Sequence, residues 1–385
     1  MAVQSYAGAT GYRSVMKVVF RADASQQIGT GHVMRCLTLA DALNARGAEC
    51  SFICRAHPGN LIEFIRSKGY PVHSLPFSCP QEVSLLVTNK AGGGAELAHT
   101  AWLGTSLEHD VAECAVILGE LNTDWLVVDH YALDARWEVA LKRHCRKLMV
   151  IDDLADRPHQ GDLLLDQTFG RNPEDYALWV PATCTLLCGS QYALLRPEFA
   201  ELRPYSLARR RDAQLRHLLI TMGGVDKDNA TGQVLYALQS CELPANCRIT
   251  VVMGATAPWL TEVRQRAEQM PWPTDVRVNV GDMAQLMADS DLAIGAAGST
   301  SWERCCLGLP TVLIVLADNQ QQVAKGLEQA GAVYVLQRTQ RIAEHLPQAL
   351  ASLSSSTAFR TAMSQAAQRI ADGNGMATVI QYLES

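Results

Sequence analysis

Short apolar runs alternate with amphipathic segments along this chain, and that alternation limits its fold more than any other feature. Runs such as Lys17–Arg21 and Trp125–Asp129 have the length and composition of buried strands, and Val33–Ala45 has the apolar spacing of a helix. The pattern is typical of a parallel sheet covered by helices. It occurs on both sides of a polar stretch near Pro204–Ala213, so we predict two open α/β domains in tandem, with a cleft at the carboxyl ends of their strands.

The predicted strands follow directly from this alternation. Those of the first half are Lys17–Arg21, Glu49–Cys54, Trp125–Asp129, Lys147–Ile151, Leu163–Asp166 and Thr185–Cys188. Those of the second half are His217–Met222, Arg248–Met253, Val276–Val280, Leu292–Gly295, Thr311–Val315 and Ala332–Val335. After Gln337 the chain has the pattern of helices alone, so this tail is expected to pack against an existing face of the molecule.

Changes in pattern also predict the domain limits. Residues 1–15 are small and polar and have no apolar segment of a secretory signal, so we expect a disordered extension there. An N-terminal domain is expected over residues 16–207, a C-terminal domain over 208–337 and a helical C-terminal extension over 338–385. The basic run Arg209–Arg211 falls at the predicted boundary and is interpreted as a solvated linker.

Composition argues against several classes of partner. The chain has 33 lysines and arginines against 39 aspartates and glutamates, and this net charge of −6 does not fit a sequence-independent nucleic-acid binder. The longest apolar run, near Leu309–Ala317, is too short to cross a bilayer. The 12 cysteines include no C-x-x-C pair and no zinc pattern, as expected for thiols in a reducing cytoplasm. We therefore expect a cytoplasmic protein that binds neither nucleic acid nor membrane.

The turn Gly29-Thr30-Gly31 joins the first predicted strand to its helix, and His32 stands at the start of that helix. Such a turn points backbone N–H groups and the positive end of a helix dipole at one spot, and Gly29 and Gly31 let a substrate approach the backbone. A helix N-terminus favours the neutral imidazole that a general base needs. The local pattern leaves open the alternative of a loop that leads into a helix, with an incidental histidine.

Polar residues follow two further strands of the first half. Asp129-His130-Tyr131 comes directly after Trp125–Val128, and Asp152-Asp153 follows the next strand. Polar residues clustered at the carboxyl end of a strand are typical of a binding site in an open sheet. The carboxylates also suggest a metal, but no second carboxylate or histidine falls at a spacing that would complete a closed site, so we expect none.

Three turns of the second half have residues suited to a phosphorylated ligand. Gly223-Gly224 follows an apolar strand and either binds phosphate through backbone N–H groups or simply reverses the chain. Ser299-Thr300 begins a helix with two hydroxyls, which together with the helix start suits an anion. Asn319-Gln320 opens the helix after another strand, and these amides either cap that helix or point into the cleft.

Two charged residues complete the set of candidates. Glu303 lies within the first turn of the helix that Ser299 begins, and a diphosphate there would repel its carboxylate, so we expect Glu303 to face vicinal ribose hydroxyls. The alternative for Glu303 is a favourable charge at a helix N-terminus. Arg196 lies near the predicted domain junction, where it could reach a diphosphate or a sugar amide, or form a salt bridge between the domains.

Six motifs occur in an order that is similar to one known family. They are Phe20-Arg21-Ala22-Asp23-Ala24-Ser25 with Ile28-Gly29-Thr30-Gly31-His32, Val128-Asp129-His130-Tyr131, Ile151-Asp152-Asp153, Gly189-Ser190-Gln191-Tyr192-Ala193-Leu194-Leu195-Arg196, Met222-Gly223-Gly224, and Gly298-Ser299-Thr300-Ser301-Trp302-Glu303. From about Met16 to Val335 the chain resembles the UDP-2,4-diacetamido-2,4,6-trideoxy-β-L-altropyranose hydrolases of pseudaminic acid biosynthesis.

This resemblance implies a GT-B-like fold, because the family is related to GT-B glycosyltransferases such as the peptidoglycan N-acetylglucosaminyl transferase. It implies two Rossmann-like domains with parallel sheets facing across a cleft, and UDP held mainly by the second. It also implies hydrolysis of the anomeric C–O bond with inversion, without cofactor or metal, in a pathway that serves flagellin glycosylation. His32 would activate the water, and Asp23 and Asp129 are the candidates to orient His32 or the sugar amides. The segment Ser78–Ala115 and the helical tail depart from the family pattern.

Two other functions stay open on the sequence. A GT-B glycosyltransferase would use the same base with an acceptor hydroxyl in place of water, although no apolar and basic patch for a lipid acceptor occurs between Val33 and Leu61. A non-catalytic nucleotide-sugar sensor would keep the second-domain loops but would have no use for His32. In each case the expected partner is a small-molecule UDP-sugar. No residue pattern decides the oligomeric state, and a monomer is favoured.

Overall fold

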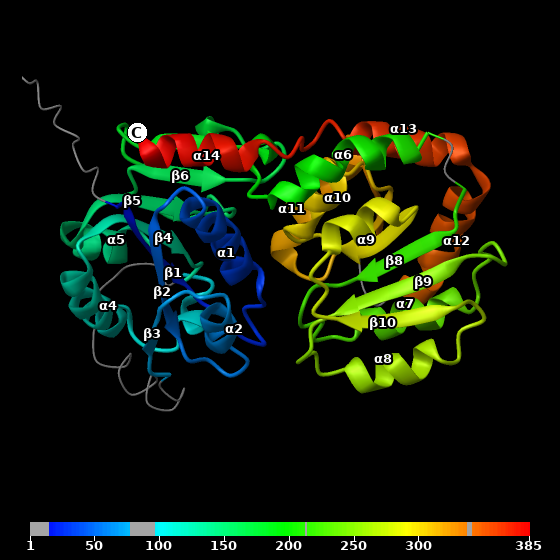
Figure 1. The fold of residues 1–385 in the computed structure, drawn as a ribbon, viewed down its shortest axis with the longest axis horizontal. Helices are drawn as coiled ribbons and strands as arrows, with labels where there is room; N and C mark the ends of the chain where they lie inside the picture. Colours follow the sequence, from blue (N-terminus) through cyan, green and yellow to red (C-terminus); the bar gives the residue numbers. More distant parts are fainter. Residues whose placement is uncertain (1–14, 78–96, 212–213, 337–340) are drawn as a thin grey trace, which may run out of the picture.

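The computed structural model describes residues 15–77, 97–211, 214–336 and 341–385, which form two α/β domains (Figure 1). Each domain has one parallel sheet with helices on both faces, and this confirms the fold class predicted from the alternation. The extension predicted over residues 1–15 lies outside the described residues except for Val15. Residues 78–96 of the Ser78–Ala115 segment lie outside them as well.

The first domain is built on a seven-stranded sheet in the order β3-β2-β1-β4-β5-β6-β7. The strands are β1 Lys17–Ala22, β2 Glu49–Arg55, β3 Val72–Leu75, β4 Thr123–Asp129, β5 Cys145–Ile151, β6 Leu163–Asp166 and β7 Thr185–Cys188. The strand order reverses between β1 and β4, and ligands of open α/β sheets bind at such a reversal. The sequence did not reveal β3, because it is a four-residue edge strand in which only Leu75 is buried.

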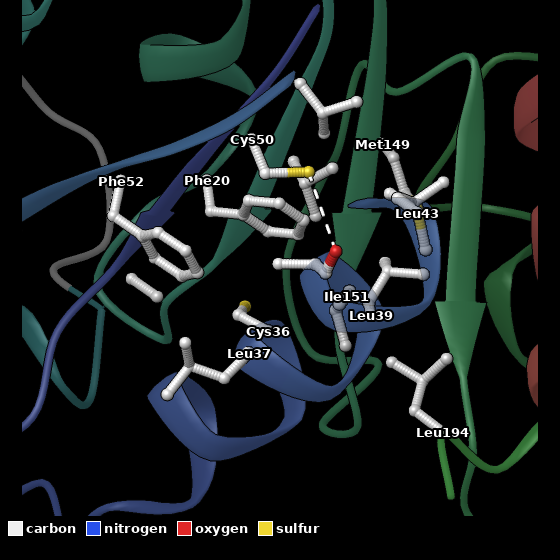
Figure 2. Packing of buried hydrophobic residues seen from close by; sticks show 14 of the residues in the cluster. Phe20, Cys36, Leu37, Leu39, Leu43, Cys50, Phe52, Met149, Ile151 and Leu194 are labelled. Carbon is white, nitrogen blue, oxygen red and sulfur yellow. Dashed lines mark hydrogen bonds between the residues drawn. The ribbon is translucent and has the colours of Figure 1, made fainter. Parts of the chain in front are cut away.

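Helices cover both faces of the first sheet. They are α1 Gly31–Asn44, α2 Ile62–Ser67, α4 Leu107–Leu121 and α5 Ala135–Leu141. Successive residues of β1 alternate between two cores: Phe20 belongs to the core under α1, and Val19 belongs to the core under α4 and α5. Figure 2 shows the core under α1, where Phe20 and Phe52 stack with their ring centroids 4.9 Å apart. These cores hold the β1 and β4 carboxyl ends in a fixed position.

The second domain repeats this plan with six strands in the order β10-β9-β8-β11-β12-β13. The strands are β8 His217–Thr221, β9 Arg248–Met253, β10 Thr274–Val278, β11 Leu292–Ala296, β12 Thr311–Ile314 and β13 Tyr334–Leu336. The helices are α6 Pro197–Arg209, α7 Ala230–Leu238, α8 Leu260–Ala267, α9 Met283–Asp289, α10 Thr300–Cys306, α11 Gln321–Gln329, α12 Ile342–Ser355 and α13 Thr357–Ala367. The order reverses between β8 and β11, so a second binding edge lies at their carboxyl ends.

The C-terminal tail packs on existing faces, as predicted, and it uses both domains. Leu346 and Leu350 of α12 and Met363 of α13 belong to a core of the second sheet. The last helix, α14 (Gly375–Glu384), returns to the first domain, where Val379 and Leu383 join the core under α1 (Figure 1). The indole N–H of Trp125 donates to the Leu383 carbonyl at 2.9 Å, and this bond fixes the end of α14 on β4.

The chain passes between the domains twice, and the two connections lie side by side. The first follows β7 and leads into α6, and the second joins α13 to α14. Ser190 of the first connection donates its hydroxyl to the Ile370 carbonyl of the second at 2.5 Å. A Cβ atom on Gly375 would lie 2.6 Å from the backbone nitrogen of Ala193, so glycine is required at this close approach. Among the described residues, no helix combines the length and hydropathy needed to span a membrane.

The basic run Arg209–Arg211 at the end of α6 is not the solvated linker that the sequence predicted. Arg210 is buried, and its guanidinium donates to the carbonyls of Met287, Ser290 and Leu307 at 2.9, 2.6 and 3.0 Å. These carbonyls end α9 and α10, where cations are favourable. The prediction of a solvated linker was wrong because the carbonyls that bind Arg210 belong to helix ends about 80 to 100 residues further along the chain, which the local sequence does not show. Helix α6 itself runs through Pro204 and packs on α9 and α10. The predicted domain limits remain predictions.

Candidate active site

A cavity of about 140 Å³ lies between the domains at the carboxyl ends of both sheets. Its wall includes residues of α1 and of the loops after β4, β5 and β6 in the first domain, and residues of the loops after β11 and β12 in the second. The polar side chains that the first domain contributes include His32, Arg35, Tyr131 and Asp153. Those of the second include Ser299, Asn319 and Gln320. The structure therefore brings predicted residues of both halves to one cavity.

His32 lies in the first turn of α1 and is held by Asp129. The His32 side chain is 9% exposed, and its Nδ1 lies 2.6 Å from Oδ1 of Asp129, a fully buried residue at the end of β4. A carboxylate bound at Nδ1 keeps the proton on that nitrogen and leaves the lone pair on Nε2. Since His32 lines the cavity, this arrangement suits a general base.

Arg35 also binds Asp129, and the sequence predictions did not include this arginine. Its guanidinium donates to both carboxylate oxygens of Asp129 and, at 3.0 Å, to Oδ2 of Asp153. Burial alone would raise the pKa of Asp129, but Arg35 and His32 hold it well below its usual value. Asp129 is therefore charged at every physiological pH. The spacing of three residues from His32 on one helix was the signal in the sequence, because such residues share a face.

Tyr131 supports His32 from a second side. The two rings meet edge to face, with centroids 4.6 Å apart and planes at 88°. The Tyr131 hydroxyl donates to Oδ1 of Asp153, which also receives Arg35 on its other oxygen. Burial and the Asp153 charge raise the pKa of Tyr131, so its hydroxyl keeps its proton. His32, Asp129, Arg35, Asp153 and Tyr131 thus form a closed ring of contacts.

Asp23 and His130 lie in the interior rather than on the wall of the cavity. Asp23 is fully buried, lies 2.7 Å from Nη1 of Arg21 and accepts the backbone N–H of Arg55 at 2.6 Å. His130 Nε2 lies 3.2 Å from Asp23, and burial lowers the pKa of His130. Of the two carboxylates predicted to orient His32, Asp129 is the one that contacts it. Asp23 instead balances a buried arginine.

Two glycine turns face one another across the domain boundary. Gly29 has φ +82°, and its N–H donates to the Ser25 carbonyl at 2.9 Å, while Gly31 begins α1 and lines the cavity. In the second domain Gly223 has φ +89°. A Cβ atom on Gly224 would lie 3.1 Å from Oγ1 of Thr30, so the Thr30 side chain would have to shift by a few tenths of an ångström to make room. Glycine at residue 224 allows the first and second domains to approach closely.

The loop between β11 and α10 forms the second-domain wall of the cavity, and a buried arginine supports it. Ser299 is exposed on that wall, and the Thr300 hydroxyl accepts from Arg304 at 3.1 Å. Arg304 also donates to the Ala296 carbonyl at 2.7 Å, and burial lowers its pKa to about 10, which leaves it charged at neutral pH. The cation and the helix start both favour an anion at this loop. Sequence reasoning missed Arg304, since an arginine in a helix is usually exposed.

The remaining predicted residues divide between the wall and its surroundings. Asn319 and Gln320 line the cavity, and the Gln320 side-chain oxygen accepts the Leu316 N–H at 2.9 Å. Glu303 is half-buried on α10 and does not line the cavity. Burial raises the pKa of Glu303, and Arg196 opposes that rise. Arg196 precedes α6 and lies over the Phe199 ring, 5.3 Å from its centroid.

Within the described ranges, no group of three or more histidine, cysteine, aspartate or glutamate side chains is placed to hold a metal ion. Asp152 and Asp153, which suggested one from the sequence, face different partners. Asp152 pairs with Arg157 at 2.8 Å and accepts the Tyr176 hydroxyl at 2.8 Å, whereas Asp153 faces Arg35 and Tyr131. The two carboxylates therefore serve separate contacts on either side of the β5 end.

Elsewhere in the first domain, one tyrosine hydroxyl lies between two carboxyl groups. Tyr176 is 2.8 Å from an oxygen of Asp152 and 2.8 Å from an oxygen of Asp166. A hydroxyl has a single proton to donate, so one carboxyl must supply the second hydrogen bond. Burial raises the pKa of Asp166 to about 6, against the opposing charge of Arg171. Asp166 is therefore the carboxyl that holds a proton in mildly acidic solution.

This arrangement predicts a stability that falls as the pH rises from about 4 to about 6, by up to about 3 kcal/mol, because folded Asp166 holds its proton more tightly than the unfolded chain does. Asp166→Asn should remove this part of the pH dependence. Denaturant unfolding of both proteins at several pH values measures it. Asp152, whose pKa is lowered to about 2, titrates below this window and does not interfere. An unchanged pH dependence in Asp166→Asn would contradict the assignment.

The comparisons with known proteins agree with this geometry. A model of the glycosyltransferase family 28 C-terminal domain matches residues 183–379. The chain is also 28% identical over 319 residues to the UDP-2,4-diacetamido-2,4,6-trideoxy-beta-L-altropyranose hydrolase of Campylobacter jejuni, which covers 82% of this chain and 97% of that protein. The resemblance that the six motifs carry is thereby confirmed.

Solved structures share the two-domain fold. MurG from Acinetobacter baumannii superimposes with a TM-score of 0.66 and 17% identity, over 96% of this chain and 99% of that chain. LpCGTa in complex with UDP gives a TM-score of 0.61 and 12% identity, over 97% of this chain and 100% of that chain. At these identities the likeness concerns the fold, which is the predicted GT-B fold. With its family model matched over residues 183–379, the chain belongs to the family of proteins that have a glycosyltransferase family 28 C-terminal domain.

Proposed function

We propose that this protein hydrolyses UDP-2,4-diacetamido-2,4,6-trideoxy-β-L-altropyranose to UDP and the free sugar, as a step of pseudaminic acid biosynthesis. The observation that carries the proposal is the contact between His32 Nδ1 and Asp129, 2.6 Å long, at the wall of a cavity that both domains complete. The relative from Campylobacter jejuni, whose name describes this reaction, supports the choice of substrate. The GT-B fold supports a nucleotide-sugar ligand.

In this mechanism the first domain provides the base. His32 Nε2 accepts a proton from a water molecule, and the water oxygen forms a bond to the anomeric carbon as the bond from that carbon to the diphosphate oxygen breaks. Asp129 stabilises the imidazolium that forms, in the way that a carboxylate orients a catalytic histidine. Attack on the face opposite the leaving group inverts the anomeric configuration. Arg35 keeps Asp129 in place by its two hydrogen bonds.

The second domain holds the leaving group. Ser299, Thr300 and the backbone N–H groups at the start of α10 bind the diphosphate, and Arg304 behind them offsets the charge that grows on it. Gly223 and Gly224, which the cavity wall does not include, are assigned to a close approach of the ligand to the backbone, and Asn319 and Gln320 contribute amides to the wall. Glu303, which lies outside the cavity wall, is assigned to the ribose hydroxyls, and the charge of Arg196 acts on it. UDP leaves as the anion, and the proton on His32 returns to solvent.

The test is incubation of the purified chain with this nucleotide sugar in ¹⁸O-labelled water without any acceptor. We expect UDP release, the label in the sugar rather than in UDP, and the inverted anomer as the first product by NMR. Label in the sugar identifies cleavage of the C–O bond. Release of UDP only after an acceptor is added would identify a glycosyltransferase, which the family match makes the main competitor. Binding without release would identify a sensor.

A further inference from the structure

The segment of residues 97–104 places aromatic side chains beside His32, and the mechanism above does not use it. Its short helix η1 (Thr100–Leu103) ends in Leu103, which is buried in the core under α4. Gly104 follows with φ +68°, and a Cβ atom there would lie 2.8 Å from the His57 ring and 2.9 Å from the Phe77 ring. Only glycine meets both conditions. The segment is therefore anchored on the first domain at its C-terminal end.

Two rings of this segment extend the surface that begins at His32. Trp102 stacks on Tyr131 with centroids 5.6 Å apart and planes at 25°, and its ring lies 6.5 Å from the His32 ring. His99 lies 4.5 Å from Trp102 and 5.3 Å from Tyr131 between ring centroids. Trp102 and His99 remain half-exposed. We name His99, Trp102 and Tyr131 the aromatic wall.

The aromatic wall is placed at the sugar end of the site. It belongs entirely to the first domain and starts at the proposed base, which must lie near the anomeric carbon. The groups suited to the diphosphate, Ser299-Thr300 and Arg304, belong to the second domain. Burial lowers the pKa of His99, with Asp156 opposing and Arg157 adding to that effect, so its ring is uncharged at neutral pH. The wall thus offers flat, uncharged faces where a sugar ring is expected.

We propose that Trp102 and His99 select the sugar, by packing against its C6 methyl and acetamido methyl groups. This inference rests on the proposed function, since it takes the UDP-linked trideoxy sugar as the ligand. A 6-deoxy sugar has a methyl group where most hexoses have a hydroxymethyl, and each acetamido group adds another methyl. Aromatic faces gain from burying such groups, whereas a hydroxyl buried against them loses its hydrogen bonds to water. One such difference is worth roughly 10–200-fold in selectivity.

The experiment measures binding in a His32→Ala background, where no turnover is expected to interfere. Dissociation constants are determined by calorimetry for the trideoxy nucleotide sugar, for UDP-N-acetylglucosamine and for UDP. Adding Trp102→Ala should lower the preference for the trideoxy sugar over UDP-N-acetylglucosamine by roughly 10–200-fold. The affinity for UDP should not change. Trp102→Phe should keep most of the preference, because it keeps an aromatic face, and His99→Ala should lower it independently.

Trp272→Ala is the matched control, since Trp272 is a partly buried tryptophan that packs on a core of the second domain, away from the His32 and Tyr131 rings that Trp102 approaches. It should leave all three affinities unchanged. An unchanged preference in both Trp102→Ala and His99→Ala would overturn the proposal, and so would an equal loss of affinity for all three ligands. Turnover by the wild-type enzyme decides the proposed function separately. Selective binding of the trideoxy sugar without hydrolysis would support the role of the aromatic wall and contradict the proposed hydrolase function.

Discussion

Replacing His32 by alanine is expected to lower kcat for hydrolysis of the nucleotide sugar by roughly 10²–10⁴-fold, the range that general-base catalysis contributes. The reason is geometric: in the described part of the chain, His32 is the histidine that both lines the cavity and bonds to a buried carboxylate through Nδ1. UDP should bind with unchanged affinity, because the proposed diphosphate site lies in the second domain. Steady-state rates of UDP release and UDP titration measure the two effects.

The control for this variant is His109→Ala. His109 lies on the exposed side of α4, with a side chain that is 54% exposed, so its removal should leave the rate unchanged. His32→Gln provides a second comparison, since glutamine can bond to Asp129 but has no basic nitrogen. Near-normal turnover in His32→Ala, with the fold intact, would remove His32 from the mechanism.

The second large effect is expected for Asp129→Asn. An asparagine amide can bond to Arg35 through its oxygen, but its NH₂ group then faces His32 Nδ1 and drives the proton of the imidazole to Nε2. In that tautomer Nε2 cannot accept a proton from water. We therefore expect a loss of kcat of roughly 10²–10⁴-fold, similar in origin to the loss in other carboxylate–histidine pairs. Rate measurements are paired with thermal unfolding, since Arg35 also loses part of its charge balance.

Asp153→Asn is the matched control for Asp129→Asn. Asp153 contacts the same arginine but meets Tyr131 rather than the imidazole. Its replacement should disturb Arg35 without changing the His32 tautomer, so the loss of rate should be far smaller. Equal losses in Asp129→Asn and Asp153→Asn, at equal stability, would show that the arginine network as a whole matters and that the tautomer argument is wrong.

The alternation of apolar runs was sufficient to predict both sheets, because strands buried on two faces are continuously hydrophobic. It failed at β3, whose Val72–Leu75 is short and mostly unburied at the sheet edge. It also could not show that α14 returns to the first domain, because an amphipathic helix does not specify which apolar face it covers. That choice depends on Trp125 and the core under α1.

The sequence predicted both His32 and Asp129 as site residues, but it could not show that the two side chains contact each other. Asp23 follows β1 and Asp129 ends the adjacent β4, with Ala22 opposite Asp129, so both carboxylates lie at the same edge of the sheet. Only the direction of each side chain separates them: Asp129 faces α1, and Asp23 faces Arg21. Arg35 and Arg304 were missed for a related reason. An arginine is usually exposed, and its burial is apparent only once its partners are placed around it.

Because the two connections between the domains lie side by side and are joined by the Ser190–Ile370 hydrogen bond, we expect them to act as one hinge. A domain joined by two adjacent connections rotates most easily about the axis that passes through both of them. Translation or twisting of the domain would instead stretch one connection or the other. The cavity between the domains should therefore open by a hinge rotation about this axis, and that rotation would move Gly224 away from Thr30. A nucleotide sugar would be admitted, and UDP released, along the side facing away from that pivot.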